Sequence, residues 1–464
     1  MTKLKPLEYI FSVKRNNNHK LITILGVKIS FKTQKLPIKQ LSEIVTELHT
    51  FKRELIIRQN YERILKKIRK ECKNRKINII FLCNSNSFTK FSYSSLYEEF
   101  AKNLKFNVKL LVSYTTNFKH NTYEKEHYKN TLVNNFKFFK NKKYDVEYAY
   151  DIEKEEFIDL EKFNPDIIFY VEPWEIAPNH DLSVTSRFAL SCFCCYGTTI
   201  HNGTYEYTVP FYRHLYKYFI DNYYARNLMI EHDVNPDSLK VFGSIKLDAY
   251  LKPIDYNKTN WKFKDKKKVI YAPHHSFSQR TYLKYGTFDK NYKFFLEYAQ
   301  KHPDIEFILK PHPVLKKEII TRKLMNEKEM KNYFETWANL PNAQICEDGD
   351  YYDMFRTSDL MITDCNSFLS EYLPTEKPLI HLISEHSVGH NEYGQKIIRG
   401  YYQARTNQDI EKHLNNILYK NHDPLLELRR EIIANDLVWE RNGTAKGIVK
   451  YLENIIFDER NNNE

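Results

Sequence analysis

Long apolar runs are missing from this chain of 464 residues, which contains no stretch of 18 or more apolar residues. We therefore expect no transmembrane helix. The first 31 residues carry Lys3 and Lys5 early but no apolar stretch closed by small residues, so a secretory signal is not expected either. Both absences point to a cytoplasmic protein.

Cysteine is scarce and odd in number, with seven residues in the whole chain. Cys192, Cys194 and Cys195 share one apolar segment, which is typical of reduced, buried thiols rather than of a disulfide framework. Cys192 and Cys195 have the C-x-x-C spacing. No second Cys or His pair with ligand spacing follows them, so we expect no structural zinc site there.

Acidic residues are outnumbered, because 71 Lys and Arg against 59 Asp and Glu give a net charge of +12. Eight basic residues lie between Arg63 and Lys76, where Glu71 is the only acid. Apolar residues recur at helical spacing just upstream, which predicts a basic amphipathic helix over residues 38–73. Two interpretations are open for this helix: it lies on the anionic inner face of the cell membrane, or it packs on a domain with a solvated basic face.

The basic charge does not by itself indicate a nucleic-acid partner. The basic residues do not form a recognisable reading motif, so we expect no nucleic acid. The non-enzymatic alternative is a basic scaffold or nucleic-acid-binding protein with a degenerate fold.

The chain has ample apolar and aromatic material, at 42% and 15% of its residues, which indicates a folded globular protein. Its length allows two domains of ordinary size. We place an N-terminal segment at 1–76, a first domain at 77–235 and a second domain at 236–464.

Strands and helices alternate along both predicted domains. Residues 20–32 alternate apolar and polar like a small hairpin. Buried-type strands are predicted at 77–82, 108–112, 167–171, 269–271, 307–309, 360–362 and 379–382. This order favours an α/β fold with two doubly wound Rossmann-like domains, which bind ligands in the crevice at the carboxyl ends of their strands.

Polar residues follow the predicted strands of the second domain. They include Pro273, His274, His275 and Ser276 after one strand, and Lys310 and His312 after the next. We expect these segments to point into one cleft. Imidazole and ammonium groups can neutralise a diphosphate, and imidazole can also transfer a proton near pH 7.

A strand, a polar turn and a helix start are predicted between Ser358 and Glu371. The turn, Thr363 to Ser367, is small and polar. Unpaired backbone N–H groups at such a turn favour an anion, so the segment predicts a phosphate site.

In these motifs the chain resembles the CDP-glycerol glycerophosphotransferase family, the teichoic-acid and capsule enzymes with the GT-B fold. The resemblance covers roughly residues 77 to 455 and rests on the segments 241–248, 270–273, 310–313, 358–371, 377–378 and 399–402. It implies that the second domain binds a nucleotide-activated donor. The donor-binding residues expected from these motifs are Gly243, Ser244, Pro273, Ser276, Lys310, Ser358, Thr363, Asp364, Asn366, Ser367, Glu371 and Arg399.

The resemblance also implies a reaction. An acceptor hydroxyl of a saccharide or polymer, possibly lipid-linked, would attack the phosphorus that carries glycerol, and a nucleoside monophosphate would leave. No metal or other cofactor is required by this arrangement. Asp348 and Asp350 match a D-x-D pattern, but acids before a helix are common and we expect no metal there. A glycosyltransferase that uses a nucleotide sugar is the alternative enzyme.

One departure from the family concerns the general base. The family's first domain usually supplies a His-Gly pair, where this chain has Cys195-Tyr196-Gly197-Thr198, with His201 as the nearest histidine. The catalytic candidates are therefore His312, His274, His275 and His201, and which of them is the base stays open. The acceptor side is expected from residues 84–97 and 172–174.

Overall fold

The structure is a computed structural model that describes residues 11–16, 19–24, 27–32, 38–84, 91–113, 122–195, 197–203, 207–277, 283–347 and 349–457. The chain forms two units, residues 1–59 and 60–464. The division falls inside one helix rather than at the predicted boundary after residue 76.

The first unit contains a small antiparallel sheet of three strands, in the order β1-β2-β3. Its strands are β1 (Phe11–Asn16), β2 (His19–Ile24) and β3 (Val27–Lys32). The hairpin predicted at 20–32 is present as β2 and β3, and β1 adds a third strand before it. Helix α2 (Ile38–Glu71) follows and confirms the helix predicted over residues 38–73.

The part of α2 inside the second unit packs through its apolar stripe. Tyr61, Ile64 and Ile68 are buried, and the Tyr61 hydroxyl donates to the carbonyl oxygen of His214 at 2.7 Å. Spacings of three and four residues place these side chains on one helix face. Residues 60–71 therefore pack on a domain with one face, and the exposed Lys66, Lys67 and Lys70 form the solvated basic face.

The first domain is built on a parallel sheet of seven strands in the order β12-β11-β10-β9-β4-β5-β6. The strands are β4 (Ile77–Cys83), β5 (Phe106–Val112), β6 (Val146–Tyr148), β9 (Ile167–Tyr170), β10 (Leu190–Cys194), β11 (Lys217–Ile220) and β12 (Leu239–Val241), with a separate pair β7 (Tyr150–Asp151) and β8 (Glu156–Phe157). Strand β12 pairs with β11, so this sheet extends past the boundary predicted at residue 235.

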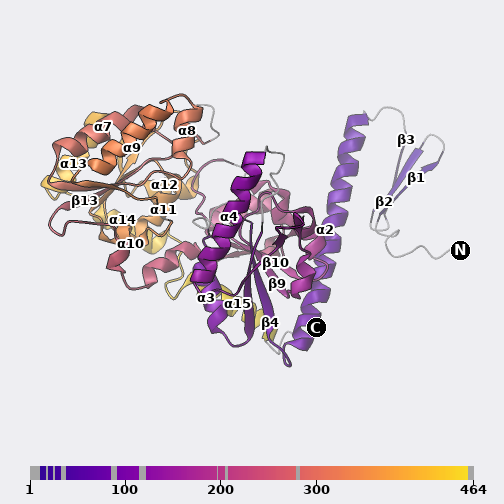
Figure 1. Ribbon diagram of the computed structural model, residues 1–464. Coiled ribbons are helices and arrows are strands. Elements are labelled where there is room, and N and C mark those ends of the chain that lie inside the picture. Colours follow the sequence, from indigo (N-terminus) through magenta and orange to yellow (C-terminus); the bar gives the residue numbers. More distant parts are fainter. Residues whose placement is uncertain are drawn as a thin grey trace. The chain divides into compact units, whose positions relative to one another are not determined.

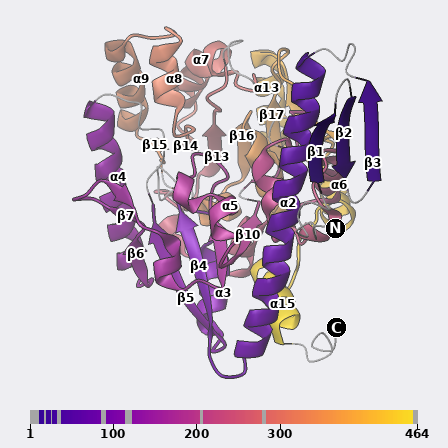
Figure 2. The same ribbon diagram turned by 90° about the vertical axis from the view of Figure 1, so that its right-hand side faces the viewer.

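Helices cover this sheet, and one of them comes from the C-terminus. They are α3 (Ser94–Lys102), α4 (Thr122–Asn141), α5 (Leu182–Thr185), α6 (Tyr223–Glu231) and α15 (Thr444–Phe457). Helix α15 lies beside α3 (Figure 2), where Lys105 pairs with Glu453 at 2.5 Å and the rings of Phe106 and Phe457 are 6.1 Å apart. Helix α15, which follows the second domain in the chain, therefore packs against the first domain.

The second domain contains a parallel sheet of six strands in the order β15-β14-β13-β16-β17-β18. The strands are β13 (Lys267–Ala272), β14 (Ile305–Leu309), β15 (Ala343–Ile345), β16 (Leu360–Thr363), β17 (Leu379–Leu382) and β18 (Tyr402–Ala404). All seven strands predicted for the two domains are present.

Helices lie on both faces of this second sheet (Figure 1). One apolar core joins the sheet to α7 (Phe288–Lys301), α8 (Leu315–Thr321), α9 (Glu327–Asn339) and α13 (Asn407–Leu414). The other joins it to α10 (Tyr352–Thr357), α11 (Asn366–Glu371), α12 (Glu392–Ile398) and α14 (Leu426–Asn435). The predicted doubly wound α/β architecture is confirmed.

Among the described residues, no helix is both long enough and apolar enough to cross a bilayer.

Candidate functional site

The candidate site lies at the carboxyl ends of three neighbouring strands. Strand β13 pairs in parallel with β14 on one side and β16 on the other, so the loops after these strands meet at one edge of the sheet. The loops are also joined through the backbone, because the N–H of His312 donates to the carbonyl oxygen of Pro273 at 3.2 Å. The predicted convergence of these motifs is therefore present.

Three histidines form a cluster at this edge. The ring centroids of His274 and His275 are 4.2 Å apart, those of His275 and His312 are 4.2 Å apart, and those of His274 and His312 are 4.9 Å apart. Burial, reinforced by the two neighbouring imidazoles, lowers the pKa of His274 well below its usual value. Burial also lowers the pKa of His275, so both rings are neutral at pH 7.

Ser276 holds the ring of His274 in place. Its hydroxyl oxygen lies 2.7 Å from Nδ1 of His274 and accepts the backbone N–H groups of Tyr285 at 3.0 Å and Gly286 at 3.3 Å. Ser276 is 1% exposed, so it orients the loop and the histidine instead of facing a ligand.

Asp364 and Thr363 form hydrogen bonds with backbone groups next to the histidine cluster. The Asp364 carboxylate accepts the N–H of His274 and the N–H of Thr287, both at 2.5 Å, and burial raises its pKa to about 6. The Thr363 hydroxyl donates to the carbonyl oxygen of Ala272 at 2.6 Å. Both residues tie β16 to the loop after β13, so their contacts are structural.

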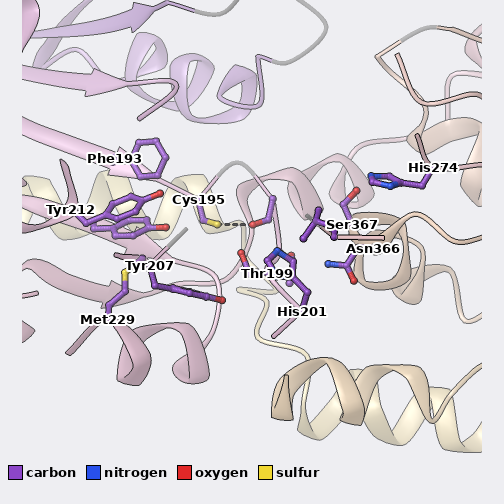
Figure 3. Close-up of a pocket in the computed structure, with 14 residues that line it drawn as sticks. Phe193, Cys195, Thr199, His201, Tyr207, Tyr212, Met229, His274, Asn366 and Ser367 are labelled. Atoms are coloured by element: carbon purple, nitrogen blue, oxygen red, sulfur yellow. Dashed lines mark hydrogen bonds between the residues drawn. The ribbon is translucent and has the colours of Figure 1, made fainter. Parts of the chain in front are cut away.

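A pocket of about 250 Å³ extends from this edge into the first domain (Figure 3). His274, Asn366 and Ser367 lie at its polar end. Oδ1 of Asn366 is buried and has no hydrogen-bond partner among the described residues. The opposite, aromatic end belongs to the first domain and contains Phe193, Tyr207, Tyr212, Tyr218 and Met229.

His201 lies between the two ends, on a segment that reaches from the first domain to the second. The side-chain amide of Asn391 donates to the carbonyl oxygens of Thr199 and His201 at 3.0 and 3.1 Å. Nδ1 of His201 accepts the N–H of Gly203 at 2.9 Å. Because Nδ1 accepts this hydrogen bond, Nε2 is the nitrogen of His201 that is left for other contacts.

The segment with Gly243 and Asp248 has a structural role. Gly243 has φ of +89°, and a Cβ there would lie 2.4 Å from the carbonyl oxygen of Val438, so only glycine fits. The Asp248 carboxylate accepts the N–H groups of Thr444 and Ala445, at 2.7 and 2.8 Å, at the start of α15. Ser244 in the same segment is buried. The segment therefore holds the start of α15 in place and does not face a donor.

Glu371 is fully buried and engaged in the second domain's core. Its carboxylate pairs with Lys246 at 2.9 Å and accepts the hydroxyl groups of Tyr351 at 2.6 Å and Tyr352 at 3.0 Å. The amine of Lys310 lies 4.7 Å from the centre of the Tyr351 ring, which connects this network to the loop of His312. Glu371 therefore positions α10 and α11 beneath the site.

Two predicted donor residues lie at the wrong edge of the sheet. Ser358 precedes β16 and bonds the carbonyl oxygen of Phe355 and the hydroxyl group of Tyr372, at 2.9 and 2.8 Å. Arg399 is exposed and precedes β18. Because these strands are parallel, both residues lie at the amino edge, opposite the histidine cluster.

The helix after the polar turn is short. Helix α11 has six residues, so the predicted phosphate site cannot depend on a long helix dipole. Among the predicted donor residues, Pro273, Lys310, Asn366 and Ser367 lie on the loops that meet at the cluster.

The described residues of the expected acceptor segments are not among those that line the pocket. The amide of Asn84 donates to the carbonyl oxygen of Trp174 at 2.8 Å, joining the ends of β4 and β9, and residues 85–90 lie outside the described part of the chain. Of the D-x-D pair, Asp348 lies outside the described residues and Asp350 pairs with Lys258 at 2.8 Å. Cys192 and Cys195 are buried thiols, as predicted.

The aromatic end of the pocket was missed at the sequence level. Its residues come from β10, β11, α6 and the segment 207–212. The high aromatic content of residues 205–224 was the only signal, and aromatic residues are equally typical of an ordinary core.

Part of the chain is similar to a known family. Residues 257–436 match the model of the CDP-glycerol:poly(glycerophosphate) glycerophosphotransferase family. The resemblance predicted from the sequence is confirmed over this range, which holds the histidine cluster, Lys310, Asn366 and Ser367. The match supports a transferase of the glycerophosphotransferase type. No curated protein matches the chain.

Solved structures of low identity share the fold. A putative UDP-N-acetylglucosamine 2-epimerase from Listeria monocytogenes has a TM-score of 0.53 at 12% identity, over 83% of this chain and 97% of that one. An S. aureus MnaA structure with UDP has a TM-score of 0.52 at 12% identity, over 82% and 98%. These likenesses concern the fold alone, which is GT-B.

Proposed function

We propose that the protein is a transferase of surface-polysaccharide biosynthesis, which moves glycerol phosphate or a related phosphorylated group from a CDP-activated donor to a saccharide or polymer hydroxyl. The observation that carries this proposal is the polar end of the pocket. There, His274, Asn366 and Ser367 line the pocket inside the range that matches the family, and the ring of His274 lies against those of His275 and His312.

The polar end suits a diphosphate. Asn366 and Ser367 supply polar side chains at the pocket wall, and the loop of His312 also carries the buried Lys310, whose amine lies over the Tyr351 ring. Positioning and charge stabilisation provide most of the rate in phosphoryl transfer. His274 meets that requirement, because Ser276 and Asp364 fix its position before the donor binds.

In the proposed reaction the acceptor oxygen forms a bond to the phosphorus that carries glycerol. The bond between that phosphorus and the bridging oxygen breaks, and CMP leaves. The hydroxyl proton passes to a base. His201 lines the pocket between its two ends and is a candidate for binding the acceptor or taking that proton.

The aromatic end is proposed as the acceptor side. Tyr207, Tyr212 and Phe193 offer ring faces and hydroxyl groups at one end of the pocket, a composition that suits a sugar. This replaces residues 84–97, which the sequence suggested for that role.

Nucleotide binding and release test the proposal. A thermal-shift titration with CMP, CDP, CDP-glycerol, UDP, GDP and a short RNA should give its largest shift with CDP-glycerol, since a ligand at a hundred times its Kd adds about 2.7 kcal/mol of stability. Donor turnover should then release CMP. Release of a nucleoside diphosphate would identify a sugar transferase, and the absence of any nucleotide shift would overturn the proposal.

Peripheral binding to the inner membrane face is the second part of the proposal, and it rests on the exposed Lys66, Lys67 and Lys70 of α2. Each basic residue near an anionic surface contributes about 1 kcal/mol. The wild-type chain should co-sediment with vesicles that contain anionic lipid and not with neutral ones. The Lys66→Ala, Lys67→Ala, Lys70→Ala triple variant should lose this binding, and unchanged co-sedimentation would contradict it.

A further inference from the structure

We propose that His274, His275 and His312 form a binding site for a divalent transition metal ion. The inference concerns metal binding and does not depend on which donor the enzyme uses. It departs from the sequence-based expectation that no metal is involved.

The positions of the three rings fit such a site. One nitrogen atom of each ring lies within 4.8 Å of the nitrogen atoms offered by the other two. Imidazole nitrogens bind zinc at about 2.0–2.1 Å, which puts two ligands roughly 3.3 Å apart around a tetrahedral ion. A small inward movement of half-buried rings closes that difference.

An unsatisfied atom is the second, independent observation. Nδ1 of His275 is buried and has no hydrogen-bond partner among the described residues. A buried polar atom without a partner costs about 1–3 kcal/mol. A metal ion bound by His275 removes that cost if it coordinates this nitrogen.

His274 is already oriented for ligation. Its Nδ1 lies 2.7 Å from the hydroxyl oxygen of Ser276 and accepts the backbone N–H of Ser276 at 3.3 Å, so Nε2 is the nitrogen that a metal can reach. Metal-binding histidines typically donate their second ring nitrogen to such a partner, which fixes the ring and its tautomer. Ligation through Nε2 puts the ring proton on Nδ1, which then donates to the Ser276 hydroxyl group, while the contact from the Ser276 N–H opens.

His312 has to give up one contact. The N–H of Val314 reaches Nδ1 of His312 at 3.3 Å, at the long end of the hydrogen-bond range. Ligation through Nε2 puts a proton on Nδ1, so this contact opens when the metal binds. The contact is exposed and long, so its loss is a small cost.

The ligand set selects the type of ion. Three imidazoles without a carboxylate favour Zn²⁺, Co²⁺, Ni²⁺ or Cu²⁺ over Mg²⁺ and Ca²⁺, which prefer oxygen. Three protein ligands leave one coordination position open. His274 also lines the pocket with Asn366 and Ser367, so the proposed ion lies beside the polar end.

The first experiment measures zinc binding by isothermal titration of the full-length, chelator-treated protein. We expect one Zn²⁺ per chain. His275→Ala should raise the Kd at least about a hundredfold, more than the tenfold to hundredfold effect of losing an outer-shell partner. His422→Ala removes an exposed histidine and serves as the matched control, which should bind as the wild type does.

The second experiment identifies the ligands. Co²⁺ loaded into the protein should give the visible absorption of a tetrahedral site without thiolate charge-transfer bands, which separates this site from Cys192 and Cys195. His312→Gln, at a half-buried position, repeats the test if His275→Ala does not fold.

The outcomes separate this inference from the proposed function. Weak, non-stoichiometric zinc binding, wild-type affinity in folded His275→Ala or His312→Gln, or thiolate bands would each overturn the metal site. Stoichiometric zinc binding that these variants abolish, in a protein that binds no cytidine nucleotide, would keep the metal site and remove the proposed donor.

Discussion

The two ends of the pocket differ in how the chain builds them. The polar end comes from the segments that follow two adjacent parallel strands, β13 and β16, and each segment carries a short recognisable motif. The aromatic end comes from single residues on β10, β11, α6 and the segment 207–212. The polar end therefore leaves a pattern in the sequence, whereas aromatic residues scattered over several elements do not.

The largest effect is expected at the polar end. His312→Ala should lower kcat at least about a hundredfold, the scale typical of a proton-transfer or charge-stabilising group. Steady-state turnover of CDP-glycerol measures this, with His422→Ala as the control. A folded His312→Ala variant with nearly normal turnover would remove the cluster from the active site.

Buried histidines should make the second domain sensitive to acid. Burial, with His390 and Arg405 adding to it, lowers the pKa of His381 to about 3. Below the ordinary histidine value of about 6.5 the unfolded chain takes up a proton that the folded chain does not, so stability falls as the pH is lowered. From pH 6.5 to 5 this amounts to about 2 kcal/mol at about 1.4 kcal/mol per unit.

Urea denaturation at the two pH values tests that prediction. His381→Gln should show a fall in the free energy of unfolding that is smaller by about 2 kcal/mol, since glutamine does not titrate. The same fall in both proteins would mean that His381 is not held neutral in the folded state.

The smallest effect is expected at the aromatic end. Tyr207→Leu keeps an apolar side chain and removes the ring and hydroxyl group. It should raise the KM for a saccharide acceptor about tenfold, within the 1–3 kcal/mol of a pocket contact, and leave the thermal shift with CDP-glycerol unchanged. An equal loss of nucleotide binding would show that the two ends do not have separate roles.

Several predicted site residues turned out to support the site instead of facing it. Asp364, Ser276 and Glu371 have polar side chains in the right segments, but each is buried against backbone or other side chains. A motif gives the position of a residue along the chain. It does not say whether the side chain faces the ligand or the loop beneath it, because that depends on neighbours from other strands.

Ser358 and Arg399 show the same limit at the scale of the sheet. Each lies in a segment that resembles the family, yet both precede a strand and therefore lie at the edge opposite the histidines. Parallel pairing decides this, since only residues that follow the strands reach the carboxyl edge.

The sequence by itself determined the α/β class, the order of the principal strands, the long helix α2 and the segments that carry the donor-side chemistry. Local patterns suffice for these, because strand and helix periodicities and short polar turns are set by neighbouring residues. The tertiary structure alone decided the pairing of β12 with the first sheet, the return of α15 to α3, the aromatic end of the pocket and the closeness of His274, His275 and His312. Each of these depends on contacts between residues far apart in the chain, which only the packed sheets bring together.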